Sequence, residues 1–344
     1  MFLSGGSEMG ERIRGYEWGL TPLGPISGWP QSLRTSISLI LNTQHPMWVG
    51  WGRDLTFFYN DAYISVLSLA KHPQALGKPT AEIWREIWDI CGPLADKVLD
   101  RGEASFVNDV RLFMQRGDFL EETFFSFSYS PIRDESGNVG GLFCPSTDVT
   151  AKVLNTRRLR TLSELAVGSL VEKSAEGACA AAAAILAKNR DDIPFALFYL
   201  SGGETLHLQQ SVALADDSAG FCPSTVRIAE QKNEPQFWPV AEVWQTMRSK
   251  TISLAGATGF PLGPADQVVK EAIVLPIIWP PPTLVPRHLW KKRCAGCRNL
   301  RRGLARFPGA TAAGRMAVTG VTNPPGLKTH AFSWRTIILT CATM

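Results

Sequence analysis

The sequence predicts an α+β protein built on an antiparallel sheet whose inner face is covered by helices. Three observations predict this class: two short aromatic-rich segments separated by a turn, then a stretch with helical spacing, then three segments joined by turn signals. Strands joined by tight turns pair antiparallel, and intervening helices cover one face of the sheet. A chain of 344 residues also has room for a second domain of ordinary size.

The chain opens with an extension over residues 1–30. Thr21–Pro25 and Gly28–Pro30 are rich in glycine and proline, which break long helices. They predict an ordered extension with two exposed turns. The next segment, Ser32–Leu41, carries apolar residues at helical spacing and predicts a helix.

The first two strands are predicted at Met47–Trp51 and Leu55–Tyr59, on either side of a Gly-Arg-Asp turn. Asn60–Leu99 follows as a helical interval, which Gly92-Pro93 is expected to interrupt because proline removes a helical hydrogen bond. One apolar stripe in this interval contains Ile83, Trp84, Ile87, Trp88 and Cys91.

Three further strands are predicted at Phe106–Met114, Glu122–Ile132 and Val139–Ser146, the last two joined by a turn at Asp134–Asn138. The middle strand alternates strictly between aromatic and hydroxyl side chains. Side chains of a strand point alternately to its two faces. One face therefore receives Phe125, Phe127 and Tyr129, and the other receives Ser126, Ser128 and Ser130.

This N-terminal part resembles a known family. The resemblance rests on Pro46-Met47-Trp48, on Tyr59-Asn60-Asp61-Ala62-Tyr63, on Phe127-Ser128-Tyr129-Ser130-Pro131-Ile132-Arg133-Asp134 leading to Gly137 and Gly140-Gly141, and on the leader with Thr21–Pro25 and Trp29–Arg34. In combination these motifs resemble the PAS sensory domains of bacterial sensor histidine kinases. The resemblance implies a PAS fold, a five-stranded antiparallel sheet with covering helices, over residues 31–150.

A connecting helix is predicted over residues 151–173. Asp148–Val171 carries apolar residues among three arginines. In the PAS family such a signalling helix often pairs with its copy in a dimer, which implies a homodimer through residues 148–171. A helix packed on its own domain explains the pattern equally well, because the apolar repeat is too short to prove a coiled coil.

The segment 174–276 resembles part of a GAF domain. Ser174 can cap a helix of alanines that runs to Lys188. A hairpin is predicted from Pro194–Ser201 and Thr205–Leu214, and a helix opening with proline at Pro239–Ser249. A GAF fold needs another core strand and a closing helix, and neither is visible after Pro276. The sequence therefore predicts an incomplete GAF α+β domain after the PAS fold.

Residues 277–344 form a basic tail without a single acidic residue. Up to Pro276 there are 24 Lys and Arg against 31 Asp and Glu, and after it 11 against none. The change of composition falls in the middle of the GAF-like segment. We therefore expect this tail to be disordered or an out-of-frame translation foreign to the fold. A genuine basic tail that binds nucleic acid is the alternative.

No catalytic centre is visible. A histidine kinase needs a phosphate-accepting histidine and glycine-rich ATP boxes, and none of the five histidines has that setting. Cys294-Ala295-Gly296-Cys297 has metal-like spacing but lacks two regularly spaced further ligands, so no metal site is expected. The chain is expected to have no enzyme activity, although the resemblance implies a parent family of histidine protein kinases.

The aromatic residues of the PAS domain are the candidate site. They could line a pocket for an apolar or aromatic small-molecule signal, but aromatic stripes more often form a solid core. A haem would need an axial histidine, for which only His72 is near, and Cys91 does not match the reactive-cysteine motif of a flavin site. The cofactor therefore stays unknown. The candidate residues are Trp48, Tyr59, Tyr63, Trp84, Trp88, Phe125, Phe127 and Tyr129.

These features predict a non-catalytic signal-sensing and dimerisation module of a two-component signalling protein, whose kinase output domain is missing from the chain. Scattered single cysteines and the lack of a secretory signal or of a sufficiently long apolar run predict a cytoplasmic protein without membrane contact. The alternative function is binding of nucleic acid or another acidic surface through the basic tail. An enzyme with an unfamiliar site is a third hypothesis.

Overall fold

The computed structural model describes residues 8–117, 120–214, 220–228, 237–279 and 335–343. The chain divides into two compact units, and the division falls between Asn155 and Thr156. We call them the first unit and the second unit and describe each by itself.

The first unit contains the predicted five-stranded antiparallel sheet, in the order β2-β1-β5-β4-β3. Its strands are β1 (Met47–Trp51), β2 (Thr56–Tyr59), β3 (Ser105–Gln115), β4 (Leu120–Arg133) and β5 (Val139–Asp148). The alternation predicted for β4 is confirmed, because Phe125, Phe127 and Tyr129 are buried whereas the serines between them are only partly covered. β4 therefore turns its aromatic face toward the core.

The inner face of the sheet is covered by short helices, of which α5 contacts β3, β4 and β5. The helices are α3 (Ile64–Lys71), α4 (Thr80–Ile83) and α5 (Trp88–Arg101), with short 3-10 turns at Asp61–Tyr63 and Arg85–Ile87. The expected interruption at Gly92-Pro93 is wrong, since α5 continues through Pro93. Buried Cys91, Ala95 and Val98 lie on both sides of the proline, and their packing outweighs the cost of about 3 kcal/mol that proline imposes inside a helix.

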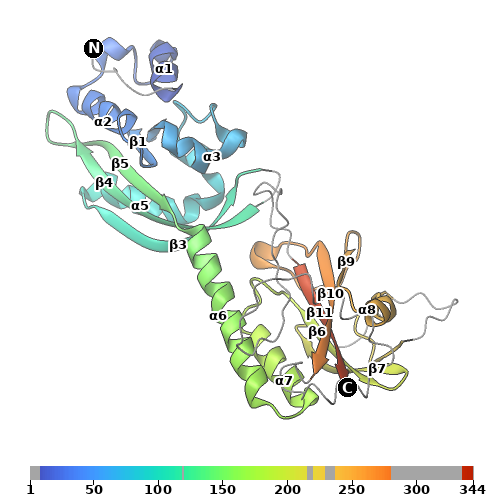
Figure 1. Ribbon diagram of the computed structural model, residues 1–344. Helices are drawn as coiled ribbons and strands as arrows, with labels where there is room; N and C mark the ends of the chain where they lie inside the picture. The colour runs from blue at the N-terminus through green and yellow to red at the C-terminus, as the bar shows by residue number, and fades with distance from the viewer. Residues whose placement is uncertain (1–7, 118–119, 215–219, 229–236, 280–334, 344) are drawn as a thin grey trace. The chain divides into compact units, whose positions relative to one another are not determined.

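In the N-terminal extension α2 packs on the outer face of the sheet, against β1, β2 and β4 (Figure 1), whereas α1 is bonded to Asp61 in the turn after β2 and to His72 after α3. It comprises α1 (Glu8–Gly15), two 3-10 turns (Trp18–Leu20 and Ile26–Gly28) and α2 (Gln31–Leu41). In the second predicted turn Gly28 is exposed as expected, but Trp29 is buried with Trp18 against Phe58 of β2. Apolar contacts with the sheet outweigh the tendency of a glycine-proline turn to face water.

Asn60 joins the loop that leads into β1 to the helix that follows β2. Its Oδ1 accepts hydrogen bonds from the backbone N–H groups of Met47 and Tyr63, both at 3.1 Å. Its Nδ2 donates to the carbonyls of Thr43 (2.8 Å) and His45 (2.7 Å). The amide is fully buried, and every donor and acceptor it carries has a partner, as a buried polar group requires.

The second unit contains a six-stranded sheet in the order β8-β7-β6-β11-β10-β9. Its elements are the part of α6 (Thr150–Val171) after Asn155, α7 (Ala175–Leu186), β6 (Ala196–Gly202), β7 (Thr205–Val212), β8 (Thr225–Arg227), α8 (Val240–Thr246), β9 (Lys250–Ser253), β10 (Glu271–Trp279) and β11 (Arg335–Thr343). Ser174 caps α7 as predicted, accepting a hydrogen bond from the Gly177 N–H at 3.0 Å. The predicted hairpin of β6 and β7 is also present.

The two faces of this sheet carry separate hydrophobic clusters. Leu197 and Tyr199 of β6 pack with Trp238 and Val243, whereas Phe198 and Leu200 pack with the alanines of α7. β6 contributes buried side chains to both clusters, and more of them than any other described strand, although β7 also reaches both through Leu206 and Val212.

The expectation that the whole tail after Pro276 lies outside the fold is wrong. β10 continues to Trp279, and β11 pairs in parallel with both β6 and β10 (Figure 1, red beside orange). Residues 335–343 are rich in Thr and Ile, a strand signal that the charge argument for the whole tail obscured. The remainder of that prediction concerns residues 280–334, which lie outside the described residues, and the out-of-frame origin stays a prediction.

The aromatic face of β4 supplies a stability test. Phe127→Ala removes a buried ring and should cost about 3–5 kcal/mol of unfolding free energy, whereas Ser128→Ala on the opposite face should cost less than about 0.5 kcal/mol. Urea unfolding monitored by tryptophan fluorescence measures both. Equal losses would mean that the two faces of β4 have been misassigned.

Candidate functional site

The candidate aromatic residues surround one cavity between the sheet and the helices of the first unit. Trp48 comes from β1, and Tyr63 comes from the turn after β2. Trp84 and Trp88 come from the helical segment, and Phe125, Phe127 and Tyr129 come from β4. All candidates except Tyr59 line the cavity, namely Trp48, Tyr63, Trp84, Trp88, Phe125, Phe127 and Tyr129. Seven of the eight candidates thus line the same interior.

The cavity is small, with a volume of about 30 Å³. This is room for about one or two water molecules, far less than a flavin or a haem occupies. One of its wall residues, Trp88, lies close along its own helix, because a Cβ on Gly92, four residues further along α5, would lie 2.8 Å from Nε1 of the indole. The geometry favours the solid-core interpretation for the state that the structure represents.

The polar groups of the cavity wall are uncharged at neutral pH. Burial raises the pKa of the Cys91 thiol to about 11 and raises the pKa of Cys144 further. Burial likewise raises the pKa of Tyr63 and Tyr129 well above the ordinary tyrosine value. The cavity thus presents hydroxyl and thiol groups without charge, which suits a neutral occupant rather than an ion.

Tyr59 lies outside the cavity wall and helps to hold α1. Its hydroxyl is 2.9 Å from Nδ1 of His72, whose Nε2 is 2.8 Å from Oε1 of Glu8. Hydrogen bonds from Arg12 and His72 hold the pKa of Glu8 below its usual range. Both ring nitrogens of His72 are thus engaged, which leaves neither free to bind a haem iron in this arrangement.

Sequence reasoning missed a polar junction where β5 runs into α6. Oδ1 of Asp148 accepts a hydrogen bond from the Thr150 N–H and its Oδ2 accepts from Nη2 of Arg116, both at 2.9 Å. The Phe124 N–H of β4 donates to Oγ1 of Thr150 at 2.9 Å. Asp and Thr just before an apolar helical pattern are a capping signal that could have identified this junction.

The junction touches the cavity wall through Arg116. Its guanidinium lies 5.4 Å from the ring of Phe125, which lines the cavity and is the register partner of Asp148. Burial opposes ionisation of Asp148, but hydrogen bonds from Thr150 and Arg116 outweigh it and lower its pKa. The carboxylate is therefore charged at neutral pH and links β3, β5 and α6.

Among the described residues, no group of three or more His, Cys, Asp and Glu side chains is arranged to hold a metal ion. In the same part of the chain, no helix combines the length and the apolar character needed to cross a bilayer.

Residues 43–154 match the family described as "PAS fold". These residues form a PAS domain. The match ends within α6 and includes every lining residue of the cavity. The PAS resemblance inferred from the motifs is thus confirmed for this part of the chain. The comparison with curated proteins finds no match.

Solved structures with a similar fold include PAS domains, some of them from histidine kinases. An RNA-binding light-oxygen-voltage receptor is 24% identical, with a TM-score of 0.30, over 42% of this chain and 41% of that one, less than half of its length. A sensory box sensor histidine kinase from Vibrio cholerae is 17% identical over 35% and 92%, with a TM-score of 0.25. The PAS domain of BvgS from Bordetella pertussis is 22% identical over 38% and 97%, with a TM-score of 0.26.

The buried thiols of the PAS domain test whether the cavity is closed. With a pKa of about 11, Cys91 has a thiolate fraction of about one in a thousand at pH 8. We expect brief alkylation of the native protein at pH 8 to leave Cys91 and Cys144 unmodified, and the rate at Cys91 to rise with pH until about pH 11. Peptide mass mapping measures both sites, and the denatured protein is the control. Rapid native modification at pH 8 would show that the interior opens readily.

Proposed function

We propose that this chain is the sensory input region of a two-component signalling protein, in which the PAS domain responds to a signal and α6 carries the response onward. The observation that carries the proposal is the path from Phe125 at the cavity through Arg116 to Asp148 at the start of α6. In this proposal the chain senses and relays, and a kinase region supplies phosphoryl transfer.

The junction can report on the cavity because each of its contacts is short and directional. An occupant that displaces the Phe125 ring also displaces the guanidinium beside it, which is hydrogen-bonded to Asp148. Asp148 accepts from the Thr150 N–H at the start of α6, and the Thr150 hydroxyl accepts from the Phe124 N–H of β4, so movement there changes how the helix begins. The PAS sheet and the helix are thereby mechanically linked.

The proposed signal is a small neutral molecule. Uncharged thiol and hydroxyl groups line the cavity, and an ion there would lose its hydration without a counter-charge. Trp88 is the half-exposed wall, and its displacement would enlarge the cavity. A ligand larger than one or two waters must enter by this kind of opening.

The second unit is proposed to be a GAF-type domain. Support comes from the capped helix α7, the hairpin of β6 and β7, and a sheet with hydrophobic clusters on both faces. β11 occupies the position beside β6 and β10 where the sequence had left the sheet open. A sheet covered on both faces matches the α+β architecture that the resemblance implied.

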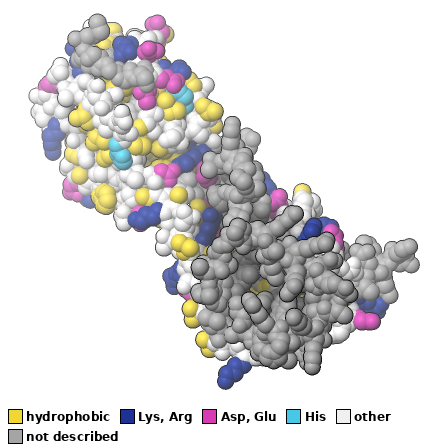
Figure 2. All heavy atoms as spheres, viewed as in Figure 1, with side chains coloured by type: hydrophobic (Ala, Val, Ile, Leu, Met, Phe, Trp, Pro, Cys, Tyr) yellow, Lys and Arg dark blue, Asp and Glu magenta, His cyan; other side chains and the backbone are white. Residues whose placement is uncertain are grey.

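The alternative function, binding of nucleic acid through the basic tail, depends largely on residues 280–334, which lie outside the described residues. On the face seen in Figure 2, charged side chains of both signs are interspersed over the described surface of the first unit. The sensory proposal has the support of specific contacts, which the alternative lacks.

Asp148→Asn tests the junction. Because the pKa of Asp148 is lowered in the folded protein, its stabilising contribution is complete above the unfolded value of about 4 and is lost as the pH falls through the lowered value. The variant should lose about 1 kcal/mol at pH 7 and less at pH 2, and amide exchange at the start of α6 should rise at pH 7.

The matched control is Asp100→Asn, which removes an exposed ion pair with Arg53 on the same domain. Urea unfolding at both pH values and hydrogen exchange with mass spectrometry measure the effects. If exchange in α6 is the same in both variants, the junction does not relay and the proposed path is wrong.

α6 is proposed to pair with α6 of a second copy. Leu159, Leu162, Val167 and Val171 are 65%, 45%, 61% and 70% exposed, whereas Leu165 packs on α7. These exposed apolar side chains lie mostly on the half of α6 opposite Leu165, an area suited to packing against a second copy of the helix. Pairing would bury these side chains.

Leu159→Glu combined with Leu162→Glu should therefore convert a dimer of the full chain into a monomer in light scattering. Leu69→Glu is the control, because Leu69 is more exposed than either leucine, at 87%, but lies on α3. A wild-type chain that is monomeric at high concentration, or a dimer that survives both substitutions, contradicts pairing through α6.

A further inference from the structure

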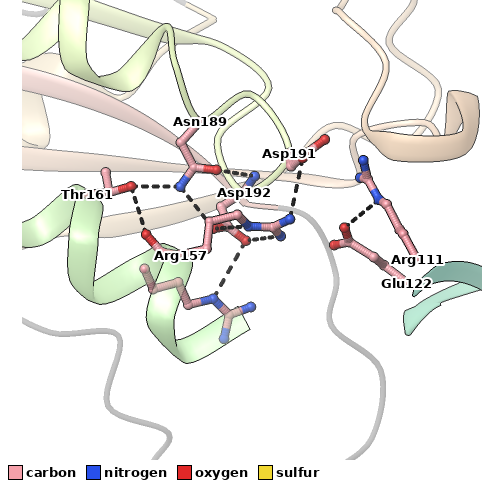
Figure 3. Close-up of polar contacts among 8 residues, drawn as sticks. Arg111, Glu122, Arg157, Thr161, Asn189, Asp191 and Asp192 are labelled. Carbon is pink, nitrogen blue, oxygen red and sulfur yellow. Dashed lines mark hydrogen bonds and ion pairs between the residues drawn. The ribbon is translucent and has the colours of Figure 1, made fainter. Parts of the chain in front are cut away.

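A polar cluster inside the second unit holds α6 to the loop between α7 and β6 (Figure 3). Arg157 of α6 donates from Nε to Oδ2 of Asp192 at 3.0 Å and from Nη2 to Oδ1 at 2.8 Å. The two side chains are only 19% and 10% exposed. This ion pair is bidentate and therefore directional, because the planar guanidinium must lie in the plane of the carboxylate.

A second contact lies one helical turn further along α6. Nδ2 of Asn189 donates to Oγ1 of Thr161 and to Oδ2 of Asp192, both at 2.9 Å. Asn189 is buried, at 7% exposure. Burial opposes ionisation of Asp192, but hydrogen bonds from Arg157 and Asn189 outweigh it and lower its pKa. Both ends of the loop Asn189–Asp192 are therefore bonded to the same side of α6.

The loop Asn189–Asp192 leads directly into β6. The chain passes from Asp192 through Ile193 and Pro194 into β6, which contributes to both hydrophobic clusters. Further along α6 the contact with α7 is close, since a Cβ on Gly168 would lie 3.0 Å from Cδ1 of Ile185. α6 therefore has an ionic and an apolar attachment to the second unit.

We propose that Arg157 and Thr161 form a latch that makes α6 and β6 move as one body, so that a displacement at the start of α6 reaches the core of the second unit. Two side chains four residues apart that hold one loop define both the rotation and the axial position of the helix. A rotation by one residue, about 100°, breaks both contacts together, so the latch is either closed or open. The inference rests on the proposed relay from the PAS domain.

The test uses two variants of the full chain. Arg157→Lys keeps the positive charge but loses the bidentate geometry, and Thr161→Val keeps the shape of the side chain but loses its hydroxyl. Arg160→Lys is the matched control, because Arg160 is 79% exposed and pairs with Glu164 on the same helix. We expect amide exchange in residues 156–166 to rise about tenfold in each latch variant and to stay unchanged in the control.

A second experiment measures whether a change at the start of α6 reaches β6. It adds Asp148→Asn to the wild-type chain and to each latch variant. With the latch intact, this change should alter exchange in both α6 and β6. With Arg157→Lys or Thr161→Val, exchange in α6 should still respond and β6 should not. Thr161→Val alone is sufficient if the arginine variant does not fold, because it leaves the ion pair in place and removes only the bonds of one hydroxyl, from Nδ2 of Asn189 and to the Arg157 carbonyl.

The outcomes separate this inference from the proposed function. If Asp148→Asn alters α6 but leaves β6 unchanged with the latch intact, the latch is wrong. It is also wrong if Arg157→Lys raises exchange equally in β7 and α8, because the ion pair would then stabilise the second unit without positioning α6. If Asp148→Asn alters neither segment, the relay from the PAS domain fails, and the rise in residues 156–166 then decides alone whether the latch holds α6.

Discussion

The four hydrogen bonds of the buried Asn60 amide are the contact on which the first unit depends. They hold the loop before β1 and the turn after β2 in one place, and so they define where the sheet begins and where the helices leave it. An apolar side chain at this position would remove the partner of the Thr43 and His45 carbonyls and of the Met47 N–H, whereas the Tyr63 N–H would keep its bond to the Asn60 carbonyl. Each buried group left unpaired costs about 1–3 kcal/mol. The aromatic cavity exists because β1 and the helices are held at this distance.

Arg116 makes the second important contact, because it joins the aromatic core at Phe125 to the charged carboxylate of Asp148. Its guanidinium faces an aromatic ring on one side and a carboxylate at the start of a helix on the other. An aromatic core by itself transmits little, because many weak contacts adjust independently. A charged hydrogen bond at its edge has one preferred geometry, so a small displacement of the core alters a specific bond. This is why the PAS interior can be closed and still be proposed as a sensor.

The same combination recurs in the second unit. Arg157 is held by Asp192 beside the apolar contacts of α6 with α7, and the loop that carries the carboxylate leads into β6. A half-buried ion pair adds little net stability, because desolvation offsets much of the attraction. It adds specificity of position, which a relay between domains needs. The alanines of α7 permit the close approach of α6, and the ion pair selects its rotation.

The local sequence pattern was sufficient to predict most of the helices and strands and to group most of the residues that line the cavity. The alternation of β4, the hairpin of β6 and β7, and the cap at Ser174 depend on residues near one another in the chain, and the structure has each of them. Long-range packing decided the rest. Pro93 stays inside α5 because buried neighbours hold the helix, Tyr59 leaves the cavity to bond His72, and β11 enters the sheet beside β6. The partners of Arg116 and Arg157 lie 32 and 35 residues away along the chain, a pairing that no local period encodes.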